Sequence, residues 1–147
     1  VNKCTKCTQG FMPPSAFQEL ASFKLYYSDT GIMSARTNMN LERIMSSESE
    51  HFRGIFAENY VACALKANGY ELMYWESDGK AEVDFLIIRG DHVIPVECKA
   101  AGDHVRAKSL AIYKEKYHPE YCIRISTRNF GTAAGIKSVP LYAVFCI

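Results

Sequence analysis

Residues 81–100, AEVDFLIIRGDHVIPVECKA, have the pattern of two apolar β-strands around a tight turn. A glycine-first turn favours Gly90 and Asp91 as its two central residues, and this choice fixes the register of the hairpin. Because side chains alternate between the faces of a strand, the register predicts one face made of apolar pairs. These pairs are Val83 with Cys98, Phe85 with Val96, and Ile87 with Ile94. We expect that face to be core.

The other face of the hairpin carries charged residues at the end far from the turn. There the register places Asp84 opposite Glu97 and Glu82 opposite Lys99. Facing carboxylates destabilise a sheet, and a divalent cation such as Mg²⁺ offsets their repulsion. A surface network in which Lys99 pairs with Glu82 or Glu97 explains the same charges, so the spacing alone leaves both interpretations open. Pro95 cannot donate to the ladder, and a bulge there could shift the register.

A helix predicted over residues 52–69 adds a third acid. Its apolar stripe contains Ile55, Ala62 and Leu65. Glu58 lies on the same stripe, three residues after Ile55 and four before Ala62. A carboxylate on an apolar surface is costly unless a positive group meets it. We therefore expect Glu58 to approach the charged end of the hairpin from the packed helix.

Further strands and one more helix follow from hydrophobic periodicity and turn residues. They are predicted as a strand at 70–77, a helix at 105–118, a strand at 121–128 and a final apolar strand at 139–147. With the helix at 52–69 and the hairpin, the order is helix, three strands, helix, two strands. This order predicts an α/β fold with a central mixed β-sheet flanked by helices.

Residues 1–50 are the least regular part of the chain, and we expect them to be an appendage or linker from an upstream region. The main domain is then predicted to cover residues 51–147. Within the first part, residues 22–35 predict a short strand and a helix with Ser28 or Asp29 as its N-cap.

Cysteine and histidine patterns favour packing over chemistry. Cys4 and Cys7 form a C-x-x-C pair, which is half of a zinc site with no second half in the sequence. The alternative for this segment is a frayed, polar N-terminal strand. The other cysteines stand singly in apolar patterns, where free thiols pack as small hydrophobes. The scattered histidines support no nucleophile scheme; they are His51, His92, His104 and His118.

The composition is that of a globular protein. The chain has 147 residues, of which 48% are hydrophobic, and a formal net charge of +1. These values indicate one domain, with or without a short appendage. Apolar runs fall far short of the roughly 20 residues that span a bilayer, and no leader pattern precedes them. We therefore expect a cytoplasmic protein without a membrane partner.

The charged residues and their order resemble the PD-(D/E)xK nuclease superfamily. Glu58 on a first helix, Asp84 on a strand, and Glu97-Cys98-Lys99 on the next strand follow its motif, although Val83 replaces the usual proline. The resemblance implies a restriction endonuclease-like fold with an αβββαβ core. It also implies that Asp84 and Glu97 hold Mg²⁺ or Mn²⁺, with Glu58 as a further ligand or water-orienting group. Lys99 would position the attacking water or stabilise developing charge, and the substrate would be DNA.

A second resemblance covers nearly the whole chain. The segments that carry it are FKLYYSDTGIMSA (23–35), FAENYVACALKANGYELMYW (56–75), AEVDFLI (81–87), VIPVECKA (93–100) and YCIRISTRNFG (121–131). They are similar to DUF4143, a C-terminal domain of unknown function in bacterial and archaeal AAA+ type ATPases. The resemblance implies an upstream ATPase domain as partner. Since these 147 residues contain no G-x-x-x-x-G-K-[ST] loop, we do not expect them to bind ATP by such a loop themselves. A catalytically inactive module that binds nucleic acid or protein, in a monomer or an oligomer, is the alternative to a nuclease.

Overall fold

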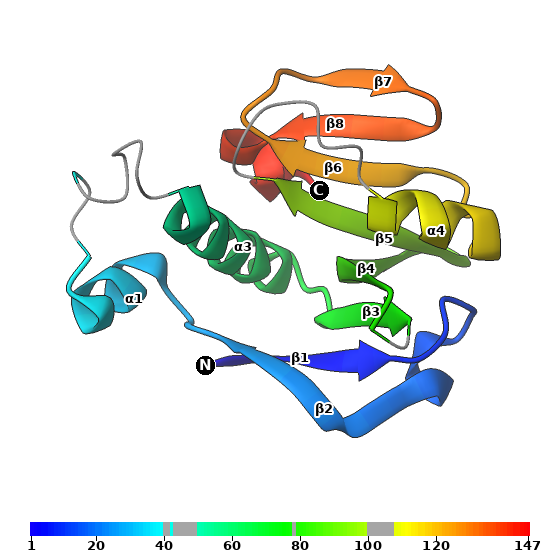
Figure 1. Cartoon of the computed structure of the whole chain (residues 1–147), viewed down its shortest axis with the longest axis horizontal. Helices are drawn as coiled ribbons and strands as arrows, with labels where there is room; N and C mark the ends of the chain where they lie inside the picture. The colour runs from blue at the N-terminus through cyan, green and yellow to red at the C-terminus, as the bar shows by residue number, and fades with distance from the viewer. Residues whose placement is uncertain (40–41, 43–49, 78, 100–107) are drawn as a thin grey trace.

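The protein, described by a computed structural model over residues 1–39, 42, 50–77, 79–99 and 108–147, is built on one eight-stranded sheet. Figure 1 shows the strand order β2-β1-β3-β4-β5-β6-β8-β7 from bottom to top. The strands are β1 (Asn2–Cys7), β2 (Gln18–Tyr26), β3 (Met73–Ser77), β4 (Ala81–Arg89), β5 (His92–Lys99), β6 (Cys122–Ser126), β7 (Gly131–Ala133) and β8 (Ile136–Pro140). The sheet is mixed, since β1–β3, β5–β6 and β6–β8 are parallel pairs and the other pairs are antiparallel.

Helices α1 (Thr30–Thr37), α3 (Glu50–Ala67) and α4 (Lys108–Tyr117) accompany the sheet, with 3₁₀ segments η1 (Pro14–Phe17) and η3 (Leu141–Cys146). The order α3, β3, β4, β5, α4, β6 is the predicted order, and the predicted α/β class with a mixed sheet flanked by helices is confirmed. The first residues of the helix predicted at 105–118, and His104, lie outside the described residues. None of the described helices combines the length and the apolar character that crossing a membrane requires.

The predicted hairpin is confirmed. Gly90 adopts a φ of +57°, which glycine tolerates better than other residues, and Arg89 pairs with His92 across the turn. The ladder continues in the predicted register to Phe85, which pairs with Val96. Pro95 sits within this regular ladder, so the bulge considered at that position does not occur there.

A bulge lies instead in β4, on its other side, against β3. The neighbouring pairs are Met73 with Leu86 and Trp75 with Val83. Tyr74 alone therefore opposes both Asp84 and Phe85, and such an extra residue breaks the alternation of side chains. As a result Val83 packs in a different cluster from Phe85. The prediction that Val83 and Phe85 share a face was wrong for this reason.

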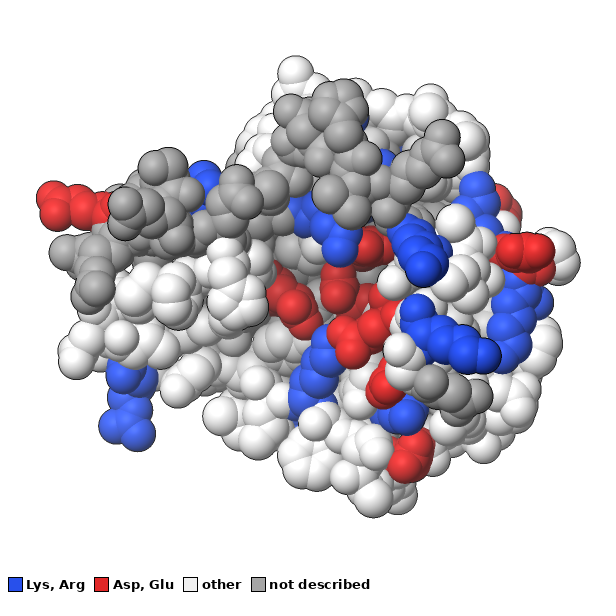
Figure 2. Space-filling view, viewed as in Figure 1, with Lys and Arg blue, Asp and Glu red and all other residues white. Residues whose placement is uncertain are grey.

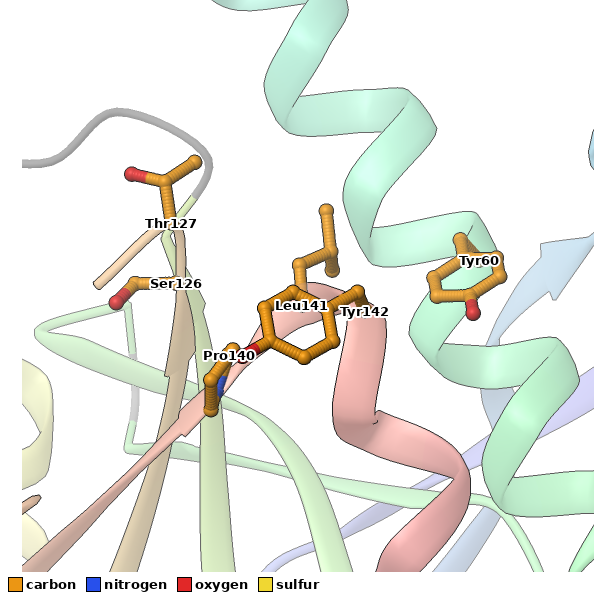
Figure 3. A pocket seen from close by; sticks show the side chains of 6 residues that line it. All are labelled: Tyr60, Ser126, Thr127, Pro140, Leu141 and Tyr142. Atoms are coloured by element: carbon orange, nitrogen blue, oxygen red, sulfur yellow. The ribbon is translucent and has the colours of Figure 1, made fainter. Parts of the chain in front are cut away.

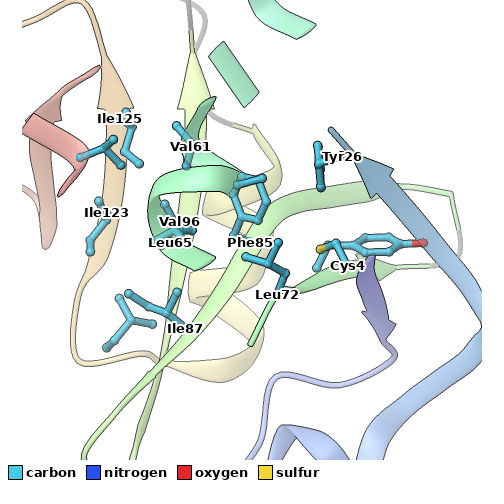
Figure 4. Packing of buried hydrophobic residues seen from close by; sticks show 14 residues of the cluster. Cys4, Tyr26, Val61, Leu65, Leu72, Phe85, Ile87, Val96, Ile123 and Ile125 are labelled. Carbon is cyan, nitrogen blue, oxygen red and sulfur yellow. The ribbon is translucent and has the colours of Figure 1, made fainter. Parts of the chain in front are cut away.

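The two helices α3 and α4 cover opposite faces of the sheet. The α3 cluster joins Val61, Ala62 and Leu65 to Phe85, Ile87, Ile94, Val96, Ile123 and Ile125, as Figure 4 shows for most of them. The α4 cluster joins Leu110 and Tyr113 to Trp75, Val83, Leu86 and Val93. Because strand residues alternate between the two clusters, the sheet is buried on both faces.

The N-terminal segment is part of the sheet. β1 pairs with both β2 and β3, and Asp29 caps α1 by accepting the backbone N–H of Ile32 at 3.0 Å. Cys4 and Cys7 are fully buried, but Cys4 belongs to the α3 cluster and Cys7 to the α4 cluster. The two thiols therefore lie on opposite faces and do not form half of a zinc site. The alternative of a frayed strand was also wrong, while the domain boundary at residue 50 stays a prediction.

The predicted final strand at 139–147 was wrong after Pro140. β8 ends at Pro140, and η3 follows it with Val144 fully buried in the α3 cluster. A proline cannot donate to a ladder but suits the start of a helical turn, so an apolar run after it can form either structure. The side chain of Asn68, at the end of α3, fixes η3 by donating to the carbonyls of Phe145 and Ile147 at 2.9 Å each.

Gly10 should tolerate no side chain, because a Cβ atom there would lie 2.6 Å from Cζ of the fully buried Tyr113. We expect Gly10→Ala to lower the free energy of unfolding by about 1–3 kcal/mol, measured by urea denaturation, through overpacking. Gly54→Ala in α3 is the matched control, since a Cβ there meets no atom within 4 Å. Alanine favours a helix interior, so this control should be neutral or stabilising. Equal effects of the two substitutions would contradict the close approach at Gly10.

Candidate active site

Charged side chains gather in the middle of the molecular face shown in Figure 2, with carboxylates and basic groups side by side. The four residues predicted as a site come from three elements: Glu58 from α3, Asp84 from β4, and Glu97 and Lys99 from β5. The charges of Glu58 and Glu97 both act on the pKa of Asp84. Folding therefore brings the predicted acids near one another although up to 39 positions separate them in the sequence.

The carboxylate of Asp84 lies where the ladder between β4 and β5 ends. Its Oδ2 accepts a hydrogen bond of 2.7 Å from the backbone N–H of Cys98, just beyond the last ladder pair. Burial raises the pKa of Asp84, the charges of Glu58 and Glu97 raise it further, and the Cys98 bond and Lys24 lower it. The result is a pKa of about 7. A carboxyl group that titrates near neutrality within a charged cluster is a candidate for function.

Glu97 is the most buried acid of the site, with 3% of its surface exposed. Its Oε1 forms an ion pair of 2.8 Å with Nζ of Lys99. Burial lowers the pKa of Lys99, but the bond to Glu97 and its charge outweigh burial and raise that pKa, so the ammonium persists at neutral pH. Oε2 of Glu97 is buried and has no hydrogen-bond partner among the described residues. An unsatisfied carboxylate oxygen is costly, and a cation would satisfy it.

Asp84 stands between the other two acids. Val96 and Cys98 pack on the α3 side, so Glu97 between them projects from the opposite side of the strand. Glu58 reaches the site from α3 itself. Because the carboxylate of Asp84 is bonded to the backbone of β5, it lies between the strands, with Glu58 toward one face and Glu97 toward the other.

Glu58 and Glu82 are joined by a lysine that was not predicted. Oε1 of Glu58 accepts hydrogen bonds from Nζ of Lys24 at 3.3 Å and from the hydroxyl of Tyr26 at 2.5 Å. Lys24 also pairs with Glu82. Glu58 therefore meets a positive group, as its place on an apolar surface required, and Glu82 forms an ion pair with Lys24 instead of Lys99. Burial lowers the pKa of Lys24, but Glu58 and Glu82 together raise it above its usual range.

Lys24 and Tyr26 belong to β2, within the segment expected to be an appendage. In the sequence, only the alternation of Lys24, Leu25 and Tyr26 could have indicated that Lys24 and Tyr26 share one face of a strand. In the structure both face inward, and Leu25 between them is exposed. Such alternation predicts a buried face but not what that face contacts. The pairing of β2 with β1, and of β1 with β3, brings Lys24 to the acids.

The donor set suits a divalent cation bound by a pair of carboxylates. Within the described part of the chain, no three or more His, Cys, Asp or Glu residues are close enough together to hold a metal ion. Mg²⁺ takes one or two carboxylates and completes its shell with water and phosphate oxygens. Asp84 and the unsatisfied oxygen of Glu97 fit this requirement, and Glu58 already has two partners of its own.

The raised pKa of Asp84 predicts a pH-dependent stability. The carboxyl of Asp84 is protonated in the folded state up to about pH 7, whereas in the unfolded chain it ionises near its ordinary pKa of 3.8. The contribution of Asp84 to the free energy of unfolding is therefore complete below pH 4 and is lost as the pH rises to about 7. Asp84→Asn mimics the protonated form, so its free energy of unfolding relative to wild type should increase by about 1–4 kcal/mol between pH 4 and pH 8.

Urea denaturation of both proteins at several pH values measures this difference. Glu120→Gln is the control, because Glu120 is an exposed acid that pairs with His92 at the turn end of the hairpin, away from the site. A difference between wild type and Asp84→Asn that stays constant over this pH range would show that Asp84 is ionised throughout.

Comparison with known proteins identifies a family. Neither the curated proteins nor the solved structures contain a match to this chain. Residues 53–144 match a family described as a domain of unknown function, DUF4143, and include Glu58, Asp84, Glu97 and Lys99. Since this match covers more than half of its length, the chain belongs to the DUF4143 family.

Proposed function

We propose that the chain is a Mg²⁺-dependent nuclease domain that cleaves DNA phosphodiester bonds, as part of a longer protein with an ATPase domain. The observation that carries the proposal is the carboxyl of Asp84, held between two further acids where β4 and β5 part, with Lys99 beside Glu97. Phosphodiester hydrolysis needs a cation that activates water and offsets developing charge, and a nearby ammonium adds to that effect.

The order of elements supports a restriction endonuclease-like fold. The succession α3, β3, β4, β5, α4, β6 has the αβββαβ form of the PD-(D/E)xK core. Glu58 lies on the first helix of this succession, Asp84 on its second strand, and Glu97 with Lys99 on its third. These are the positions at which the superfamily carries its acids and its lysine.

The chain's residues would divide the chemistry between them. Asp84 and Glu97 would hold Mg²⁺ or Mn²⁺, and Glu58 would orient a water molecule, since no three acids of the described residues are close enough together to share a cation. A bound cation would supply an activated water and charge neutralisation at the phosphate. Lys99 stays protonated at neutral pH and would hold the attacking water or the negative charge that develops on the phosphate.

One observation favours the alternative of a non-enzymatic module that binds nucleic acid or protein. Glu58 and Glu82 share an ion pair with Lys24, and Glu97 is paired with Lys99. Ion-pair networks of this kind also occur as purely structural features. The enzyme and the module therefore differ in whether a cation and a phosphate can enter this network.

Cleavage assays on wild type, Asp84→Asn and Lys99→Ala test the proposal. With Mg²⁺ or Mn²⁺ we expect wild type to cleave single-stranded, duplex or branched DNA, and each variant to lose at least about 100-fold in rate. In chelator at pH 8, where Asp84 is ionised, Asp84→Asn should bind DNA as well as wild type or more tightly, because one negative charge near the phosphate is gone.

Glu120→Gln is the control in the same assays and should cleave like wild type, since Glu120 pairs with His92 far along the hairpin. Thermal melts establish that each variant is folded before rates are compared. Equal cleavage by wild type and Asp84→Asn would assign the chemistry to another site or a contaminant. Metal-independent DNA binding without cleavage by any form would support the binding module.

Lys24 gives a second test, because it acts as a tethered cation in the acidic network. Removing a positive charge about 4 Å from a carboxylate makes that carboxylate more attractive to Mg²⁺ by about 1 kcal/mol, or roughly 5-fold in affinity. We expect Lys24→Met to bind Mg²⁺ about that much more tightly in isothermal titration calorimetry. Lys6→Met is the matched control, since Lys6 pairs with Glu19 and Glu76 outside the site. Unchanged or weaker Mg²⁺ binding by Lys24→Met would show that Lys24 does not compete with a cation for the acids of the site.

A further inference from the structure

An open pocket of about 530 Å³ lies at the end of β6, the strand next to β5. Figure 3 shows Leu141 and Tyr142 of η3 between Tyr60 of α3 on one side and the end of β6 on the other. The described residues that line it are Tyr60, Ser126, Thr127, Pro140, Leu141 and Tyr142. Its volume is in the range of pockets that bind small molecules or parts of larger ones.

The elements that form the pocket also carry the site residues. Ser126 is the direct neighbour of Lys99 in the parallel register of β5 and β6. Tyr60 follows Glu58 by two residues on α3. A ligand in the pocket would therefore lie at the end of β6, the strand that runs beside the end of β5.

The lining has a chemistry that selects the kind of ligand. None of the six described lining residues is charged, so no side chain there neutralises the charge of a phosphate or a carboxylate. The lining offers two tyrosine rings with Pro140 and Leu141, and Figure 3 shows the hydroxyls of Ser126 and Thr127 pointing away from the tyrosines. These groups suit a flat, uncharged ring, because aromatic side chains stack on such rings.

Tyr142 is exposed, but the 3₁₀ segment η3 that carries it is bonded to the end of α3. Its side chain has 68% of its surface exposed, whereas Val144 on the same 3₁₀ segment is fully buried. Asn68 binds the carbonyls of Phe145 and Ile147 and so ties η3 to α3. An exposed ring on an immobilised segment can stack on a ligand with little loss of conformational entropy.

We propose that this pocket takes an unpaired nucleobase adjacent to the scissile phosphate, so that the substrate is single-stranded DNA or a duplex with an unpaired nucleotide. The inference rests on the proposed function and names its substrate class. Bases inside a regular duplex are stacked on their neighbours and present no free face to Tyr142.

Fluorescence anisotropy in chelator, with a labelled single-stranded oligonucleotide and its duplex form, tests the proposal without requiring cleavage. Tyr142→Ala should weaken single-strand binding about 5- to 100-fold and leave duplex binding unchanged. Tyr142→Phe retains the ring and should bind like wild type. Phe23→Ala is the control, because Phe23 is 47% exposed on β2 at the opposite end of the strand order.

A 2-aminopurine base in the oligonucleotide provides a second readout, since its fluorescence is quenched when it stacks on a protein ring. We expect quenching with wild type and Tyr142→Phe and its loss with Tyr142→Ala. Equal single-strand affinity of wild type and Tyr142→Ala, or equal losses for single strand and duplex, would overturn the pocket assignment. Failure of the nuclease proposal has a different signature: no cleavage by wild type, with the selective effect of Tyr142→Ala intact.

Discussion

The extra residue in β4 is the constraint on which the rest of the site depends. Tyr74 of β3 opposes two residues, Asp84 and Phe85, and this bulge ends the regular alternation of β4. Phe85 keeps its place in the core under α3, while Asp84 turns its carboxylate to the backbone N–H of Cys98. The carboxylate of Asp84 thus accepts the backbone N–H of Cys98 at the point where the ladder between β4 and β5 ends. Bulges often re-aim a side chain next to a functional site, and this bulge places an acid between two others.

The electrostatics of the site follow from that position. Glu58 pairs with Lys24 and accepts a hydrogen bond from Tyr26, and one oxygen of Glu97 pairs with Lys99 while the other has no partner among the described residues, so two of the three acids have an internal positive partner. Asp84 has a backbone donor and two negative neighbours in a buried environment, which raises its pKa to about 7. The negative charge of the network is therefore only partly offset, because Asp84 has no ion-pair partner of its own in the part of the chain that the structure describes. Under the proposed function, a cation held by Asp84 and by the free oxygen of Glu97 would offset these charges, which is why we propose an enzyme before a binding module.

Segments from both ends of the described chain complete the site. β2 delivers Lys24 and Tyr26 to the acids, through a sheet that runs continuously from β2 to β7. η3 delivers Tyr142 to a pocket whose other wall is Tyr60 of α3. The proposed cleavage chemistry and the proposed base pocket consequently share α3, because Glu58 and Tyr60 lie on the same helix two residues apart.

The sequence by itself determined the features that depend on near neighbours. Glycine-first turn chemistry predicted the hairpin at Gly90 and its register, and hydrophobic periodicity predicted α3, α4 and the class of the sheet. The identities of Glu58, Asp84, Glu97 and Lys99 as one group also came from the sequence, through motif order. Tertiary structure alone decided the bulge, because it arises from pairing with β3 and leaves no mark within β4. It also decided that the segment after Pro140 is helical, that Cys4 and Cys7 face opposite ways, and that Lys24 meets Glu58. Each of these depends on contacts between residues distant in the chain, and local propensity does not specify such contacts.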